Sequence, residues 1–449
     1  MHASFGTDGV RGTANVAVTA ELALALGRAA TRVFGAEVVV VGRDTRISGP
    51  MLEAAVCAGA CAEGAEATAI GVAPTPAVAH ACAEPLDGRV TAGVMISASH
   101  NPFADNGLKI FGPGGRKLTD AQQGRVAAEL ATLLDGEAHA GPADAAVGAT
   151  VPPAGQVDGY AEFVQASIEG RSLGGIRVVL DCANGANWKI GPRVLRALGA
   201  EVEVIGAHPD GVNINDGCGS NHPHGLASAV TGRSADIGIA FDGDADRVVA
   251  VDHLGRVADG DQLMAILAGD MRSRGLLAGD TVVVTVMSNL GFRRAMDAAG
   301  ITVVDTSVGD RYVLEALEEG GFSLGGEQSG HLVFRDITTT GDGLLSAVLL
   351  LDLIARTGRP LADLVDGAMQ RLPQVLVNVP IESPMKDVAQ RLSAEIAAVE
   401  SDLGDAGRVL LRPSGTEPVV RVMAEADTEQ LASAAAQTLV EAVRGLSSA

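Results

Sequence analysis

The strongest constraint on the fold is a pattern that occurs three times along the chain. An apolar β-branched run is followed by a polar loop, a helical stretch and a second apolar run, beginning at Glu37–Val41 (EVVVV), Arg177–Leu180 (RVVL) and Thr281–Val286 (TVVVTV). Short continuous apolar runs of this kind are typical of strands buried on both faces. Each copy therefore predicts a βαβ unit, whose ligand-binding loops gather at the carboxyl ends of the strands.

The C-terminal segment follows a different pattern. We predict a strand at Gln374–Ile381, one helix at Met385–Leu403, strands at Arg408–Leu411 and Val419–Met423, and an Ala-rich helix at Thr428–Val443. Alternating and helical periodicities mixed in this way indicate a small α+β domain.

The length of 449 residues, at about 150 residues per domain, leaves room for several separate cores. We predict an α/β protein with mixed sheets, made of three similar α/β domains and a smaller C-terminal α+β domain. The expected ranges are 1–150, 151–254, 255–370 and 371–449. Residues 135–153 are small, polar and without periodicity, so we expect them to link the first two domains.

Charge and targeting signals limit the partners and the compartment. The 33 Lys and Arg against 55 Asp and Glu give a net charge of −22, so the chain as a whole repels nucleic acid and anionic membranes. The start, Met1–Thr13, has no signal-peptide pattern, and the apolar run Leu344–Ala355 is too short to span a bilayer. Five cysteines without a CxxC pair are typical of a reduced compartment. We expect a cytoplasmic monomer or homodimer that binds neither nucleic acid nor membrane.

The first candidate motif is SASHNP, Ser97–Pro102, which follows the apolar run VTAGVMI. A serine is a weak nucleophile that needs a base or a metal, and His100 and Lys109 are close to Ser99 in sequence. A simple Asx or proline turn is the alternative interpretation. No GxSxG elbow surrounds Ser99, which disfavours a triad hydrolase.

The second motif, DGDADR, follows the apolar run DIGIAF and places carboxylates at Asp242, Asp244 and Asp246. Alternate residues of an extended loop share one side, and several carboxylates together suit a hard divalent cation. Arg247 stands where a calcium hand requires glycine, which excludes that loop type. Solvated loop acids are the alternative.

Two further motifs suit the binding of a sugar phosphate. In GGEQSGH, Glu327 and Ser329 stand among glycines that allow close backbone approach, which suits sugar hydroxyls, although a plain turn is equally consistent. In RPSGTEP, which begins at Arg412 and is followed by Arg421, hydroxyls, a glycine turn and two arginines favour a phosphate nest or an ordinary hairpin turn.

Taken together and in this order, FGTDGVRGT, SASHNP, DGDADR, GGEQSGH and RPSGTEP resemble the α-D-phosphohexomutase superfamily along the whole chain. The resemblance implies four domains around a central cleft. The segments GTDGVRG (Gly6–Gly12) and TTGDG (Thr339–Gly343), with Gln328, resemble the bacterial branch that acts on glucosamine phosphates. That branch interconverts glucosamine 6-phosphate and glucosamine 1-phosphate for UDP-N-acetylglucosamine and cell-wall synthesis. A phosphomannomutase or phosphoglucomutase with the same mechanism is the alternative.

The resemblance also implies roles for individual residues. Ser99 would carry a phosphoryl group and, with Asp242, Asp244 and Asp246, would hold Mg²⁺. Lys109 would be the general acid/base, because a desolvated lysine crowded by cations has a lowered pKa, and His100 would support it. The other expected site residues are Arg11 and Arg247 near the phosphoserine, Glu327 and Ser329 on sugar hydroxyls, and Arg412, Ser414, Gly415, Thr416 and Arg421 on the non-reacting phosphate.

The expected partners are a hexosamine phosphate substrate and a 1,6-bisphosphate intermediate that turns end for end in the cleft, with the terminal domain as a lid. A metal-dependent phosphatase, a DxD glycosyltransferase and a non-catalytic sugar-phosphate-binding protein are rival functions. The chain has no Rossmann glycine fingerprint, which counts against a nucleotide-sugar transferase.

Overall fold

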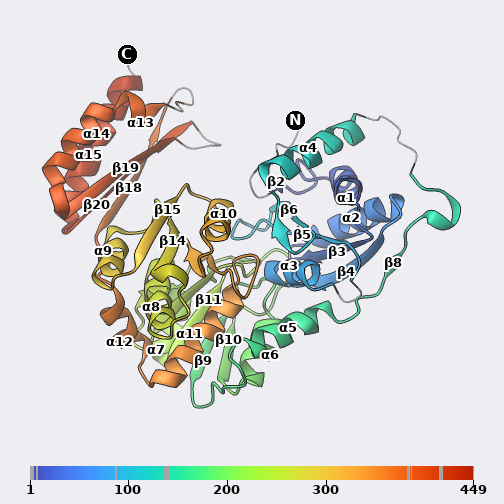
Figure 1. Ribbon diagram of the computed structural model, residues 1–449, viewed down its shortest axis with the longest axis horizontal. Helices are drawn as coiled ribbons and strands as arrows, with labels where there is room; N and C mark the ends of the chain where they lie inside the picture. Colours follow the sequence, from blue (N-terminus) through green and yellow to red (C-terminus); the bar gives the residue numbers. More distant parts are fainter. Residues whose placement is uncertain are drawn as a thin grey trace. The chain divides into compact units, whose positions relative to one another are not determined.

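The computed structural model describes residues 5–6, 9–85, 88–135, 141–381, 385, 387–413 and 418–447 (Figure 1). The chain divides into two compact units, which are described separately. The first unit comprises residues 1–286 and 302–367, and the second comprises residues 287–301 and 368–449.

The first sheet of the first unit has eight strands and carries the Ser99 loop. Its order is β1 (Phe5–Gly6), β2 (Gly9–Thr13), β6 (Asp105–Gly112), β5 (Thr91–Ile96), β3 (Val38–Arg43), β4 (Glu66–Val72) and β8 (Thr150–Val151), with β7 (Arg116–Lys117) paired to β6. Strand β3 runs parallel to β4 and β5, whereas β6 runs antiparallel to β5. The first βαβ unit is therefore present within a mixed sheet.

Helices cover both faces of this sheet. The apolar sides of α1 (Ala20–Phe34), α2 (Gly49–Ala62) and α4 (Asp120–Leu134) share one buried core with alternate residues of the strands (Figure 1). Helix α3 (Thr75–Ala83) packs on the opposite face, where Val78 comes so close to Gly42 and Gly93 that a Cβ at either glycine would lie within 2.8 Å of it. Small residues in these strands thus set how closely α3 approaches.

The predicted linker at 135–153 contains more structure than expected. Residues 136–140 lie outside the described part, but Asp144–Ala146 form a short 3-10 helix and Thr150–Val151 form β8. Strand β8 pairs with β4 at the edge of the first sheet. The unpaired backbone groups of an edge strand favour such pairing even where the passing sequence has no strand periodicity.

The second and third sheets repeat the pattern. The second has the order β10 (Glu201–Ile205), β9 (Arg177–Asp181), β11 (Ile237–Phe241), β12 (Val248–Asp252) and β13 (Val257–Ala258), and the third has the order β15 (Thr302–Thr306), β14 (Thr281–Thr285), β16 (Leu324–Gly326) and β17 (Leu332–Phe334). Their helices in the first unit are α5 (Gln156–Ala166), α6 (Ile190–Ala197), α7 (His224–Arg233), α8 (Gly260–Ser273), α10 (Asp310–Gly320), α11 (Gly343–Thr357) and α12 (Leu361–Ala368), with a 3-10 turn at Ala278–Asp280. Both sheets are mixed, as predicted.

The second unit contains the antiparallel sheet β18 (Gln374–Pro380), β20 (Val419–Ala426) and β19 (Gly407–Pro413). Its helices are α9 (Leu290–Ala298), α13 (Val388–Arg391), α14 (Ser393–Leu403) and α15 (Glu429–Ser447), and Gly404–Ala406 form a 3-10 turn. The single helix predicted at Met385–Leu403 is wrong, because the chain breaks at Leu392 with φ −103° and ψ 22°. The break allows Leu392, as well as Val388 and Leu403, to enter the core of the unit.

The apolar run Leu344–Ala355 lies within α11, most of whose residues are buried, as predicted for a core helix. Within the described ranges, every helix is too short or too polar to cross a lipid bilayer. All five cysteines are free.

Candidate functional site

The Ser99 loop leaves the carboxyl end of β5, and its first residues, 97–99, are buried. Ser99 is 1% exposed, and its φ of +54° lies in the left-handed region, which is uncommon for a serine. Its Oγ donates a hydrogen bond to Oδ2 of Asp242 at 2.6 Å and lies 3.4 Å from Nδ1 of His100. The loop therefore presents a hydroxyl to the first carboxylate of the aspartate motif.

The aspartate motif follows β11, and its three carboxylates converge. One carboxylate oxygen from each of Asp242, Asp244 and Asp246 lies within 4.8 Å of the other two, and none of the residues is more than 4% exposed. Oδ1 of Asp244 and Oδ1 of Asp246 are buried without a hydrogen-bond partner in the described part of the chain. Buried carboxylate oxygens without partners are costly, so this oxygen set fits a hard divalent cation.

Lys109 enters the same cluster from β6, the antiparallel neighbour of β5. Its Nζ lies 2.7 Å from Oδ2 of Asp244 and 3.3 Å from Oδ2 of Asp246. Thr75, the first residue of α3, donates to the same oxygen of Asp244 at 2.7 Å. The expectation that cations crowd Lys109 is therefore wrong, because two carboxylates face its ammonium group.

The three aspartates differ in their proton affinity. Burial, followed by repulsion from Asp246 and Asp244, raises the pKa of Asp242 well above its usual range. Burial also favours the protonated form of Asp246, but the positive groups of Lys109, His331 and Arg247 outweigh it and hold the pKa of Asp246 well below its usual range. The cluster thus combines one carboxyl that holds a proton readily with a neighbour that stays ionised.

Two arginines lie near His100, the neighbour of the Ser99 hydroxyl. Burial, then the charges of Arg247 and Arg11, lowers the pKa of His100 to about 4, so its ring is neutral near pH 7. Nη1 of Arg247 lies 3.1 Å from Nδ1 of His100. Arg11 lies on β2, opposite Gly107 of β6. Both predicted arginines therefore belong to the surroundings of Ser99.

The GGEQSGH segment forms the turn between β16 and β17. Oε1 of Glu327 accepts a hydrogen bond from the N–H of Gly309 at 3.2 Å, and Ser329 Oγ donates to Oε2 of Glu327 at 3.2 Å. A Cβ at Gly330 would lie 2.1 Å from the carbonyl oxygen of Val248, and the N–H of Val248 donates to the carbonyl of Gly330. Since Val248 begins β12 just after the aspartate loop, the glycine holds the turn close to that loop.

Several residues of the site were missed by the sequence analysis. Asp44 and Arg46, from the GRDTR loop after β3, lie fully buried beside the Ser99 loop. His331 Nδ1 lies 3.8 Å from Oδ2 of Asp246, and Thr75 and Asn215 also contact the site. The sequence could have predicted Arg46 as a site residue, because its polar loop follows a buried strand. Such loops lie at the carboxyl edge of the sheet, where the Ser99 loop also lies.

The second unit holds the remaining predicted residues. Arg412 on β19 and Arg421 on β20 are direct cross-strand neighbours. Their neighbours in sequence, Leu411, Val420 and Val422, face the buried core of the unit, so the two arginines share the opposite face of the sheet. Ser414, Gly415 and Thr416 lie outside the described residues.

Family models cover nearly the whole chain. Those of phosphoglucomutase/phosphomannomutase match at residues 2–135 (domain I), 158–255 (domain II), 259–372 (domain III) and 376–442 (C-terminal domain). The chain belongs to the phosphoglucomutase/phosphomannomutase family. The resemblance found in the five sequence motifs is thus confirmed.

Curated relatives within this family are similar over their full length. The chain is 54% identical to a phosphoglucosamine mutase of Frankia alni and 52% identical to one of Mycolicibacterium smegmatis, with 98% of each chain covered in both cases.

Solved structures show the same fold. A phosphoglucomutase/phosphomannomutase family protein from Burkholderia thailandensis has a TM-score of 0.81 at 24% identity, covering 99% of this chain and 98% of that one. Aspergillus fumigatus N-acetylphosphoglucosamine mutase, solved with GlcNAc-6P and magnesium, has a TM-score of 0.69 at 19% identity, covering 100% of this chain and 96% of that one. The predicted architecture, three α/β domains with mixed sheets and a smaller C-terminal domain, is confirmed for this member of the family.

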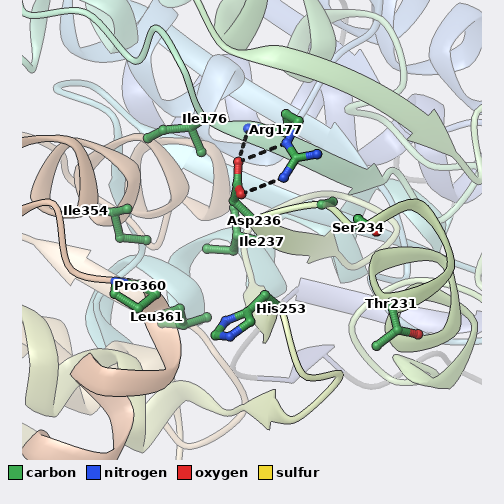
Figure 2. Close-up of a pocket in the computed structure, with 11 residues that line it drawn as sticks. Ile176, Arg177, Thr231, Ser234, Asp236, Ile237, His253, Ile354, Pro360 and Leu361 are labelled. Carbon is green, nitrogen blue, oxygen red and sulfur yellow. Dashed lines mark hydrogen bonds and ion pairs between the residues drawn. The ribbon is translucent and has the colours of Figure 1, made fainter.

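A cavity elsewhere in this phosphohexomutase does not belong to the site. It measures about 420 Å³ and lies at the amino ends of β9 and β11, where Ile176 and Ile237 line it and Arg177 pairs with Asp236 at 3.0 Å (Figure 2). Asp242 follows the other end of β11, roughly 17 Å along a five-residue strand. The cavity and the aspartate motif therefore lie at opposite edges of this sheet.

Proposed function

We propose that this chain interconverts glucosamine 6-phosphate and glucosamine 1-phosphate through a phosphorylated Ser99. The observation that carries the proposal is the hydrogen bond from Ser99 Oγ to Asp242, inside a buried cluster of three aspartates and one lysine. The curated phosphoglucosamine mutases, 50–54% identical over 98% of the chain, support glucosamine phosphate as the substrate. The rival functions of phosphatase and glycosyltransferase have no such support.

Asp242, Asp244 and Asp246 would hold Mg²⁺ together with the oxygen of Ser99. The two buried carboxylate oxygens without partners support this assignment. When bound, the ion supplies positive charge that stabilises a transferring phosphoryl group.

The reaction exchanges two phosphate ester bonds. The bond between phosphorus and Ser99 Oγ breaks as a bond forms to the free hydroxyl of the hexosamine monophosphate, giving the 1,6-bisphosphate and leaving the electron pair of the broken bond on Ser99 Oγ. Lys109 is assigned as the general acid/base that takes the proton of that hydroxyl. After the bisphosphate has turned round, its other phosphoryl group returns to Ser99, and Lys109 gives the proton back to the sugar oxygen. His100, neutral near pH 7, supports the Ser99 oxygen from 3.4 Å.

The remaining site residues bind and orient the substrate. Arg11 and Arg247 supply charge near the phosphoserine, and Glu327 and Ser329 bind sugar hydroxyls. For the phosphate that is not reacting, we assign Arg412, Ser414, Gly415, Thr416 and Arg421. The domains that carry these roles are residues 1–150, 151–254, 255–370 and 371–449, in a monomer or homodimer.

A combined rate and mass measurement tests the proposal. Mutase rates are compared on glucosamine, glucose and mannose 6-phosphates, and intact mass is recorded before and after phosphatase treatment. We expect glucosamine 6-phosphate to react fastest and the untreated protein to carry one phosphoryl group. A faster rate on glucose or mannose 6-phosphate reassigns the chain as a phosphoglucomutase or phosphomannomutase, and tight binding without turnover contradicts an enzyme.

A further inference from the structure

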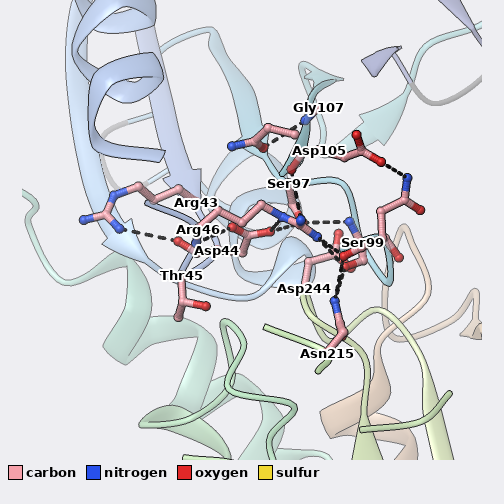
Figure 3. Close-up of polar contacts among 12 residues, drawn as sticks. Arg43, Asp44, Thr45, Arg46, Ser97, Ser99, Asp105, Gly107, Asn215 and Asp244 are labelled. Carbon is pink, nitrogen blue, oxygen red and sulfur yellow. Dashed lines mark hydrogen bonds and ion pairs between the residues drawn. The ribbon is translucent and has the colours of Figure 1, made fainter. Parts of the chain in front are cut away.

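Arg46 is a fully buried arginine behind the Ser99 loop, and its guanidinium makes no contact with solvent. Nε donates to Oδ2 of Asp44 at 2.8 Å. The other donors end on backbone carbonyls of the loop: Nη1 donates to Pro102 and Asp105 (2.9 Å), and Nη2 donates to Ser99 (3.0 Å) and Asn101 (2.9 Å). Figure 3 shows Arg46 among Asp44, Ser97 and Ser99. One side chain therefore fixes four carbonyls of a single turn.

Asp44 and Ser97 extend this contact to the N–H of Ser99. Ser97 Oγ donates to Oδ2 of Asp44 at 2.6 Å and accepts the hydrogen bond of the Ser99 N–H at 2.9 Å. The other oxygen, Oδ1 of Asp44, accepts from the N–H of Arg46 at 3.0 Å. Both backbone polar groups of Ser99 are thus held by one buried network of Asp44, Arg46 and Ser97, the Arg46 clamp.

A second donor reaches the same carbonyl from another domain. Nδ2 of Asn215, which follows the second sheet's β10 in sequence, donates to the carbonyls of Ser99 at 3.0 Å and Asn101 at 3.2 Å. A Cβ at Gly243 would lie 2.5 Å from the Ser99 carbonyl oxygen and 2.8 Å from Nδ2 of Asn215, so the glycine of the aspartate loop leaves room for this contact. The Ser99 carbonyl therefore accepts hydrogen bonds from two domains, one from Arg46 and one from Asn215.

We infer that Arg46 is a positioning residue that holds Ser99 in its left-handed backbone conformation and so aims Oγ at Asp242. The inference rests on the proposed role of Ser99 as phosphoryl acceptor. Arg46 acts through the loop, because each donor described here ends on a carbonyl or on Asp44. The rigid fork of a guanidinium serves several acceptors at fixed angles, which the single ammonium of lysine does not do.

The test uses Arg46→Lys and Asn215→Ala in the full chain. The turnover number is divided by the fraction of chains that take up a phosphoryl group from glucose 1,6-bisphosphate, measured by intact mass. We expect kcat per competent chain to fall about 100-fold for Arg46→Lys, since misplacing a reacting group by about 1 Å costs that much. Loss of the two side-chain hydrogen bonds of Asn215 in Asn215→Ala should lower it about tenfold. KM for glucosamine 6-phosphate should stay within about twofold in both variants.

Hydrogen exchange of the peptide covering residues 97–105 gives a readout that does not need activity. Loop amides should exchange faster in both variants than in the parent chain. The matched controls are Arg356→Lys, whose arginine lies in the last turn of α11 and pairs with Asp352 and Asp270, and Asn213→Ala, whose amide donates to the carbonyl of His208. Both controls should keep the parent's kcat and the parent's exchange in this peptide.

A purely structural role gives a different result. In that case Arg46→Lys lowers the melting temperature or the fraction of chains that take up a phosphoryl group, but leaves kcat per competent chain unchanged. This result would overturn the inference. If Arg46→Lys does not fold, the result for Asn215→Ala is used instead. The inference is then overturned if Asn215→Ala keeps both the parent's kcat and the parent's hydrogen exchange in the loop. If the parent chain fails to turn over glucosamine 6-phosphate, the proposed function fails separately, and unchanged exchange in the variants then overturns the clamp.

Discussion

The Ser99 loop and the arginine pair of the second unit are two sites of different construction. Around Ser99, buried side chains bond the backbone at both the N–H and the carbonyl, so the hydroxyl has little freedom. Arg412 and Arg421 are half-buried neighbours on the outer face of a three-stranded sheet. The comparison teaches that the group proposed to form a phosphate ester is held in place by burial, whereas the arginines proposed to bind a phosphate are more accessible.

The same difference appears in the charges. In the first unit, buried acids and bases shift one another, as in the raised pKa of Asp242 and the lowered pKa of His100. Long cationic side chains on a sheet surface remain able to adjust to a phosphate. Substitutions in the first region should therefore change the rate, and substitutions in the second should change affinity.

The largest effect is expected for Ser99→Ala. The change removes the phosphoryl acceptor and little packing, so kcat should fall by about a thousandfold or more while the melting temperature stays close to the parent's. Steady-state kinetics and calorimetry measure the two quantities. Ser346→Ala, another buried serine, is the control and should stay active. Near-normal turnover in Ser99→Ala would exclude a phosphoserine mechanism.

Asp244→Asn should have the next largest effect. A carboxylate that accepts from Lys109 and Thr75 becomes a neutral amide and a weaker ligand for a hard cation. We expect kcat at fixed Mg²⁺ to fall about a hundredfold, with partial recovery at excess Mg²⁺. Asp236→Asn, at the opposite end of β11, is the control. A variant whose magnesium titration matches the parent's would remove this loop from the metal site.

Arg412→Ala probes the second region. The loss of a charge-assisted contact should raise KM about tenfold with a smaller change in kcat. It should also release 1,6-bisphosphate into solution, so that the reaction depends on added bisphosphate. Phosphate-ester chromatography measures the release, and Arg391→Ala on α13 is the control. Weaker binding without release or a bisphosphate requirement contradicts a role in retaining the intermediate.

The smallest effect is expected for Tyr160→Phe, which separates stability from rate within the first unit. Burial raises the pKa of Asp342 to about 6, although Leu345 and Tyr160 donate hydrogen bonds to its carboxylate, Tyr160 at 2.8 and 2.9 Å. Because this folded-state pKa exceeds the unfolded value, the stability that it contributes is complete below about pH 4 and is lost as pH rises through about 6. Removing the hydroxyl of Tyr160 raises the pKa of Asp342 further, so more stability is lost as pH rises above the pKa of the unfolded carboxyl.

Urea unfolding of Tyr160→Phe should therefore show destabilisation of about 1 kcal/mol near pH 7.5 and less near pH 5. The value of kcat should remain close to the parent's, since the Tyr160 hydroxyl donates to Asp342 and not to Ser99, Lys109 or the three aspartates of the site. A loss of stability that is independent of pH, or a large loss of rate, would contradict this assignment.

Much of the fold follows from local pattern. The β-branched runs predicted β3, β9 and β14 to within two residues at each end, because a strand buried on both faces must be continuously apolar. Sequence periodicity gave a wrong prediction where core packing determines the backbone, as at Leu392. There a break between two helices buries the Leu392 side chain. It also failed at β8, because the edge of β4 supplies the hydrogen bonds that define that strand.

The sequence by itself determined the family, the four-part architecture and the chemical groups of the site, because these lie in short contiguous motifs. Only the tertiary structure decided that Arg46 belongs behind Ser99, that His331 faces Asp246, and that Lys109 meets carboxylates. Arg46 and Ser99 are brought together because β3 and β5 are parallel neighbours whose carboxyl ends coincide. The order of strands in a sheet is set by the packing of all three layers, which no local spacing records.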